Sequence, residues 1–157
     1  MDPVFRSSNV ADDDAHELLS EYFTERTLGF DPTAGGYRTV LPDPANFVPP
    51  AGLFLVVLDE HEDPVGCGGI RMLDPRRAEV KHLYLRDAAR GRGWGRLLLA
   101  ELEQRAIEFG ATEVVLDTNA SLTVAGALYR RSGYTEIAPY NENPNATLWF
   151  CKVLTAE

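Results

Sequence analysis

The sequence has few cysteines, no long apolar run and no excess of basic residues, and each shortage excludes a class of protein. The longest unbroken apolar run, Leu53–Leu58, has six residues, whereas a membrane-spanning helix needs about 20. The first residues, Met1–Pro3, lack the basic and then apolar pattern of a signal peptide. We therefore expect a cytoplasmic protein with no membrane partner.

Acidic residues outnumber basic ones, 24 to 15, which gives a formal net charge of −9. A nucleic-acid-binding domain usually has a basic face, so no nucleic acid partner is expected. The two cysteines, Cys67 and Cys151, lie in apolar, strand-like segments, where reduced buried thiols are common and a core role outweighs a nucleophilic one. Motifs typical of metal-dependent or covalent catalysis, such as H-E-x-x-H, C-x-x-C and G-x-S-x-G, are absent, so no metal is expected.

The length of 157 residues and the 45% hydrophobic content suit one folded domain over residues 1–157. Apolar spacing of 3 and 4 residues predicts helices, and short apolar runs between turn residues predict strands. The predicted helices span 13–28, 94–109 and 125–132, the predicted strands span 53–58, 65–72, 78–85, 114–117, 134–137 and 148–154, and 31–51 is a proline-rich irregular loop. The fold class is a mixed α/β (α+β) sheet, with an antiparallel meander first and one strand–helix–strand crossover in the middle.

A glycine-rich turn, Arg90–Arg96, joins the third strand of the meander to the long helix. Glycines let backbone N–H groups approach a ligand, and a helix N-terminus carries partial positive charge, so this turn predicts a pyrophosphate site. Four arginines fall within the eleven residues 86–96 that include this turn: Arg86, Arg90, Arg92 and Arg96. The spacing matches neither a P-loop nor a dinucleotide fingerprint. A plain solvated connection is the alternative.

Two motifs together resemble a known family. The pattern Arg90-x-x-Gly93-x-Gly95, following the strand 78–85, resembles the acetyl-CoA-binding motif of the GNAT N-acetyltransferase superfamily. The segment Ala125–Tyr134 is similar to that family's A-x-x-L-Y-x-x-x-G-[FY] helix and strand start. The resemblance covers about residues 53–154 and implies a single-domain acyl-CoA N-acyltransferase fold, with a sheet splayed at its centre and helices on both faces. A proline that many members carry near Asp87 is absent here.

The resemblance implies acetyl-CoA as co-substrate, with its pyrophosphate on the glycine-rich turn and its pantetheine arm along the third strand. The Leu83 N–H would then donate to the thioester oxygen that becomes negative during attack. Asn119 would contact the pantetheine or would only shape a turn. The cofactor-binding residues implied are Leu83, Tyr84, Leu85, Arg90, Gly91, Arg92, Gly93, Trp94, Gly95, Arg96, Asn119, Ala125 and Tyr129.

Two residues are expected to move protons. Glu79 stands eleven residues before Arg90, where several GNAT enzymes keep a glutamate base, and simple strand alternation places it on the face of Leu83. It would act directly or through a water, or it would be a surface glutamate near Lys81. Tyr129 matches the family's general acid for the leaving thiolate, with simple packing as its alternative. His82 is expected to be a packed or surface histidine.

The acceptor pocket is expected to come from the first helix, the loop 31–51 and the segment 139–144, which the cofactor motifs do not use. Four acids in or near these parts would favour a cationic amine or would be solvated surface: Glu25, Asp31, Asp43 and Glu142. The predicted reaction is acetylation of a primary amine on a small molecule by direct attack in a ternary complex. The alternatives are acetylation of a protein N-terminus or lysine, and a non-catalytic acyl-CoA-binding regulatory module. Relatives are often dimers, so a homodimer is one expected state.

Overall fold

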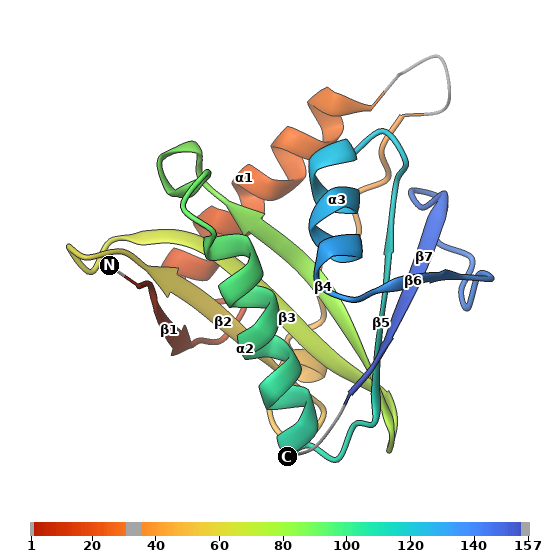
Figure 1. Ribbon diagram of the computed structural model, residues 1–157. Coiled ribbons are helices and arrows are strands. Elements are labelled where there is room, and N and C mark those ends of the chain that lie inside the picture. The colour runs from red at the N-terminus through yellow and green to blue at the C-terminus, as the bar shows by residue number, and fades with distance from the viewer. Residues whose placement is uncertain (1, 31–35, 155–157) are drawn as a thin grey trace.

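A seven-stranded sheet in the order β1-β2-β3-β4-β5-β7-β6 forms the centre of the computed structural model, which describes residues 2–30 and 36–154 (Figure 1). The elements are β1 (Val4–Ser7), α1 (Asp13–Gly29), η2 (Pro44–Phe47), β2 (Gly52–Leu58), β3 (Pro64–Asp74), β4 (Arg77–Leu85), η3 (Asp87–Ala89), α2 (Trp94–Glu108), β5 (Glu113–Thr118), α3 (Thr123–Arg131), β6 (Thr135–Ile137) and β7 (Leu148–Val153). All neighbouring strands pair antiparallel except β4 and β5, which are parallel. This agrees with the predicted meander followed by one crossover.

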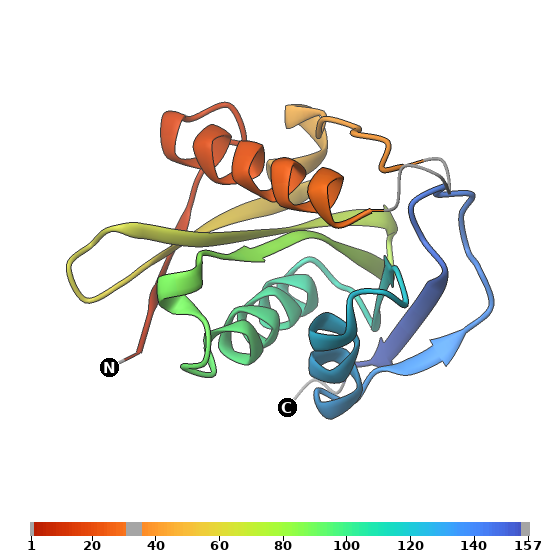
Figure 2. The same ribbon diagram turned by 90° about the horizontal axis from the view of Figure 1, so that it is seen from above.

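Helices cover both faces of the sheet, with α1 on one side and α2 and α3 on the other (Figure 2). One apolar cluster joins α2 to the sheet through residues such as Leu98 and Leu102. A second cluster packs Leu18 and Phe23 of α1 against Val56 of β2. No helix among residues 2–30 and 36–154 is long and apolar enough to cross a bilayer.

The predicted elements are confirmed to within about two residues at their ends, and the mixed α/β fold class is confirmed. The prediction missed β1, a four-residue edge strand that pairs with β2. Only Phe5 in this strand is even partly buried, so its sequence carries too little alternation to be recognised. Of the predicted loop 31–51, residues 36–51 are irregular apart from the short helix η2. Both cysteines are free, and Cys67 is buried.

The sheet opens at its centre because β4 and β5 pair over only three residues. The parallel register runs from Arg77–Glu79 on β4 to Glu113–Val115 on β5 and stops there. Beyond it the two strands diverge, and α3 lies over the mouth of the gap (Figure 1). Residues 80–85 of β4 therefore pair with β3 along one edge, and their other edge has no strand partner within the described chain.

A bulge in β4 changes which side chains share a face. His82 has φ 58°, and the register with β3 shifts between Cys67 and Gly69 at this point. Val80 before the bulge and Leu83 after it both pack in the cluster under α2. Glu79 therefore points to the opposite face from Leu83. The simple alternation used to place them together was wrong, because one bulged residue reverses the parity of everything that follows.

Candidate functional site

The glycine-rich turn at the start of α2, named the cradle, has the backbone geometry that an anion-binding site requires. Gly91 and Gly93 have φ of 77° and 76°, a region that favours glycine, and a Cβ added at either would meet no atom within 4 Å. Gly93 is the N-cap of α2, and no side chain of the described residues caps the helix. The first backbone N–H groups of α2 are thus left for an external acceptor, and the helix dipole favours a negative one.

The arginines of this turn do not form a free basic patch. Arg86 binds Glu21 of α1 with Nη2 to Oε2 at 2.6 Å, and Arg90 binds Glu25 of α1 at 2.9 Å. Glu21 and Glu25, which lie four residues apart on the same face of α1, thereby hold the start of the glycine-rich segment. The sequence places four arginines in this region, but the distant carboxylates of Glu21 and Glu25 offset the charge of two of them.

The next arginine, Arg92, binds Glu60 at 3.1 Å and stacks 3.9 Å above the ring of Trp94. Trp94 is only 2% exposed and belongs to the core, so only its backbone N–H can serve a ligand. Arg96 is exposed and has no ion-pair partner within residues 2–30 and 36–154. Backbone amides and the helix end therefore carry most of the cradle's attraction for an anion.

A cavity of about 480 Å³ opens at the gap between β4 and β5. Three predicted site residues, Leu83, Asn119 and Tyr129, line it, while Glu79 and Ala125 do not. Its other walls come from α1, from the segment 37–47 and from the loop before β7. The remaining lining residues, from these walls and from β3, β4, β5 and the loop after β5, are Tyr22, Phe23, Arg26, Phe30, Tyr37, Arg38, Val40, Leu41, Pro42, Asp43, Asn46, Phe47, Arg71, Val80, Lys81, His82, Asp117, Thr118, Leu122, Asn141, Asn143, Pro144, Asn145 and Ala146. The expected sources of the acceptor pocket thus meet at one cavity.

Tyr129 reaches this cavity from α3 and is 6% exposed. Its ring packs against Tyr134 and Phe150, with centroid distances of 6.1 and 5.9 Å. Burial is the main cause that raises the pKa of Tyr129 above its usual value near 10. The phenol therefore keeps its proton at neutral pH and is available as a hydrogen-bond donor.

Glu79 is completely buried rather than being a surface glutamate. Its Oε1 accepts a 2.7 Å hydrogen bond from Arg71 Nε, and its Oε2 accepts a 2.5 Å hydrogen bond from the Tyr140 hydroxyl. Lys81 Nζ lies 3.9 Å from Oε2. Glu79 is not among the cavity-lining residues, whereas its partners Arg71 and Lys81 are, so Glu79 stands behind the wall that these two form.

Two further predicted residues have clear structural partners. Asn119 donates from Nδ2 to the Asn145 carbonyl at 3.1 Å and accepts at Oδ1 from the Ser121 N–H at 3.0 Å. Its side chain thus shapes the turn after β5 and ties that turn to the loop before β7. Ala125, in the first turn of α3, packs against the core cluster under α2.

His82 is packed among aromatic rings, which is one of the two environments expected for it from the sequence. Its ring centroid lies 5.5, 5.6 and 5.8 Å from those of Tyr22, Phe23 and Phe47. Burial, with a smaller contribution from nearby cations such as Lys81, lowers the pKa of His82 to about 3. The imidazole is therefore neutral at physiological pH.

Sequence reasoning missed an ion pair that spans the gap in the sheet. Lys81 Nζ on β4 lies 3.5 Å from Asp117 Oδ1 on β5, and both residues line the cavity. Asp117 Oδ2 accepts a 2.7 Å hydrogen bond from Asn141 Nδ2, and the Asp117 side chain is 7% exposed. The only available signal was a polar residue near the carboxyl end of a predicted strand beside the crossover.

The acids expected to attract a cationic amine are mostly elsewhere. Glu25 is paired with Arg90, and Glu142 is not among the cavity-lining residues. Asp43 lines the cavity, and its Oδ1 also accepts from the Ala45 N–H at 3.0 Å. Asp31 lies outside the described residues.

Comparison with known proteins decides the family to which this arrangement belongs. Residues 13–134 match the model of the acetyltransferase (GNAT) family. This chain belongs to the GNAT family. An uncharacterised N-acetyltransferase of Schizosaccharomyces pombe is 36% identical over 134 residues, which cover 84% of this chain and 81% of that protein. The chain is accordingly an acetyl-CoA-dependent acyltransferase.

Solved structures share the GNAT fold over nearly the whole chain. A Klebsiella pneumoniae protein assigned as an acyl-CoA N-acyltransferase superposes with a TM-score of 0.78 at 25% identity, covering 98% of each chain. A phosphinothricin acetyltransferase of Sinorhizobium meliloti, in complex with acetyl-CoA, superposes with a TM-score of 0.68 at 22% identity, covering 98% of this chain and 89% of that one. The uncapped helix end with its two positive-φ glycines and the unpaired edge of β4 fit such a co-substrate.

Proposed function

We propose that this protein transfers an acetyl group from acetyl-CoA to the primary amine of a small molecule, by direct attack in a ternary complex. The observation that carries the proposal is the cavity at the splay, because it joins the open edge of β4, the hydroxyl-bearing Tyr129 and the acceptor walls in one space. Its volume of about 480 Å³ is in the range of small-molecule sites.

A cross-link beside the cavity supports a small acceptor over a polypeptide. The Arg38 N–H donates to Asn145 Oδ1 at 2.8 Å, and Asn145 Nδ2 donates to the Arg38 carbonyl at 2.7 Å. These two bonds tie the segment after α1 to the loop before β7, and both residues line the cavity. Such a link favours an enclosed ligand, because an extended peptide would need a continuous open groove.

The cradle residues Gly91–Arg96 would hold the pyrophosphate through backbone N–H groups, and residues 83–85 would hold the pantetheine arm along the open edge of β4. Acetyl-CoA, when bound, supplies an activated acetyl thioester. The Leu83 N–H would donate to the thioester oxygen. Tyr129, whose phenol keeps its proton, would donate a hydrogen bond toward the departing sulfur.

The acceptor must lose a proton before it can attack, since only about 0.04% of an ammonium with a pKa near 10.4 is neutral at pH 7. Lys81 at the gap disfavours a second cation nearby, and Asp117 beside it is a carboxylate that faces the cavity. We assign proton acceptance to Asp117, directly or through a water. Glu79 then acts as a positioning residue that holds Arg71, Tyr140 and Lys81 from behind the wall.

The test is thiol release from acetyl-CoA across a panel of small primary amines, with peptides bearing a free N-terminus or lysine as rival acceptors. We expect turnover on a small amine, and a fall in kcat of about 10²-fold for Asp117→Asn with acetyl-CoA affinity unchanged. Acetyl-CoA binding without turnover on any acceptor would instead identify a non-catalytic acyl-CoA-binding module. Turnover restricted to peptides would identify a protein acetyltransferase.

A further inference from the structure

The charge of the cavity is opposite to that of the protein. The chain carries a net charge of −9, yet its cavity is lined by four cationic side chains and two acidic ones. The cations are Arg26, Arg38, Arg71 and Lys81, and the acids are Asp43 and Asp117. A plain ammonium acceptor would meet net repulsion there, whereas an anionic group would be attracted.

The ion pairs show which cations are left for a ligand. Arg71 is bound to Glu79 and Lys81 lies beside Asp117, so these two are largely compensated. Within residues 2–30 and 36–154, no ion pair involves the guanidinium of Arg26 or of Arg38. Asp43 on the segment 37–47 also makes no ion pair among these residues, so the α1 and 37–47 side of the cavity carries two uncompensated cations against one acid.

Arg26 is held in place by aromatic residues rather than by acids. Its Cζ lies 4.8 Å from the centroid of the Tyr22 ring, and the residue is partly buried against the cavity. The charge of Arg26 acts on the hydroxyls of both Tyr37 and Tyr129, and the opposite charge of Asp117 acts on the same two hydroxyls. Arg26 and Asp117 are therefore both close enough to Tyr129 for their charges to act on its hydroxyl.

Part of the lining is aromatic and apolar. Phe23 and Phe47, both buried, line the cavity together with the partly buried Phe30. The rings of Phe30 and Tyr37 meet edge to face at 5.0 Å. An acceptor that fills this space therefore needs an apolar body as well as its charged groups.

Resting on the proposed function, we infer that the acceptor amine also carries a carboxylate, as an amino acid with an apolar side chain does, and that Arg26, with Arg38 at the rim, binds this carboxylate. A guanidinium suits this role because its planar N–H groups match a carboxylate in two parallel hydrogen bonds. The amine would then face Asp117 and the open edge of β4, and the side chain would lie on the aromatic wall.

The experiment compares apolar L-amino acids, including leucine, methionine, phenylalanine and tryptophan, each with its own carboxamide. Binding to the protein saturated with CoA is measured by calorimetry, and kcat/KM is measured with acetyl-CoA. The amine of a carboxamide is less basic and so more often neutral, which favours the amide in the chemical step. Tighter binding of at least one amino acid than of its amide, by about tenfold or more, is the expected result.

Variants separate recognition from other effects. Arg26→Gln should remove the preference for the carboxylate by weakening only the amino acid, while Arg26→Lys should retain part of it. The matched control is Arg76→Gln, because Arg76 is exposed and is not among the cavity-lining residues. If Arg26→Gln does not fold, Arg38→Gln at the exposed rim provides the same comparison with a smaller expected loss.

The two proposals fail in different ways. Equal or tighter binding of the amides, no binding of any amino acid, or an unchanged preference in folded Arg26→Gln would overturn the carboxylate inference. Amino acid binding that depends on Arg26 without any acetyl transfer would support the inference and contradict the proposed function. Efficient acetyl transfer to amines without a carboxylate would support the proposed function and contradict the carboxylate inference.

Discussion

Arg71 Nε donates a 2.7 Å hydrogen bond to Glu79 Oε1, and this pair joins β3 to β4 at the last residue where β4 still pairs with β5. Glu79 is wholly buried, whereas the Arg71 side chain is 36% exposed. The carboxylate is therefore fixed at the apex of the splay and cannot turn toward the cavity without losing its partners. Its position predicts a structural effect on substitution.

Glu79→Gln should lower the free energy of unfolding by about 2 kcal/mol, because charge-assisted hydrogen bonds to Arg71 and Tyr140 become neutral ones. Urea unfolding measures this change. Catalysis should fall less than in Asp117→Asn. A large loss of kcat with unchanged stability would instead support Glu79 as the direct base.

Tyr129→Phe should reduce kcat by about 10²-fold while the dissociation constant for acetyl-CoA changes little. Since burial raises the pKa of Tyr129, ionisation of this phenol should not lower the wild-type rate below about pH 10. Tyr134→Phe is the matched control. It removes a buried 2.8 Å bond to Glu103 Oε2 and should cost stability without a comparable loss of kcat. Equal kinetics in both variants would remove the assignment of Tyr129.

Gly93→Ala should weaken acetyl-CoA binding by about tenfold, since the new Cβ points into the open space of the cradle. The positive φ of 76° should also cost about 1 kcal/mol of stability. Gly29→Ala near the end of α1 is the control, because no atom lies within 4 Å of its Cβ position and its φ is not in the left-handed region. That variant should gain about 0.5 kcal/mol. Calorimetry with CoA measures the affinity, and thermal unfolding measures the stability. An unchanged CoA affinity in Gly93→Ala would contradict the role of the cradle in binding.

Glu21→Gln should destabilise the protein, because it weakens the link between α1 and the start of the cradle. The size of this loss of stability should depend on pH. The hydrogen bond from Arg86 is the main cause that lowers the folded pKa of Glu21 below its ordinary value of 4.5. A carboxylate with a depressed pKa contributes stability that is complete above the unfolded pKa and is lost as the pH falls through the folded value. The stability difference from wild type should therefore be full above about pH 5 and shrink toward pH 3.

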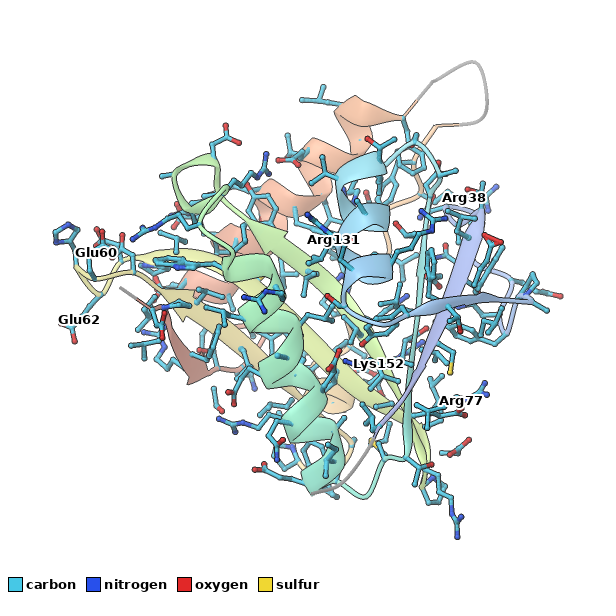
Figure 3. All side chains as sticks on the ribbon, in the orientation of Figure 1. Arg38, Glu60, Glu62, Arg77, Arg131 and Lys152 are labelled. Atoms are coloured by element: carbon cyan, nitrogen blue, oxygen red, sulfur yellow. The ribbon has the colours of Figure 1, made fainter. Side chains whose placement is uncertain are left out.

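Urea unfolding at a series of pH values from 7 to 3 measures this difference. Glu62→Gln is the control, because Glu62 projects from the hairpin between β2 and β3 and makes no ion pair within residues 2–30 and 36–154 (Figure 3). A difference for Glu21→Gln that does not depend on pH would contradict an ionic contribution.

The sequence by itself determined the parts of this protein that depend on neighbours along the chain. Helical and strand spacing predicted all the main elements except β1, and the glycines at 91 and 93 predicted the cradle before α2. These features follow from backbone sterics and from the apolar face that each element must bury, so a local window contains the information.

Only the tertiary structure decided the charges and faces of the site. The bulge at His82 sent Glu79 to the face opposite Leu83, and the glutamates of α1 offset the arginines of the cradle. Cations from α1, the following segment, β3 and β4 made the cavity positive in an acidic protein. Such outcomes depend on which distant side chains come within a few ångströms, because an ion pair or a buried carboxylate is a property of that encounter and not of the residue's place in the sequence.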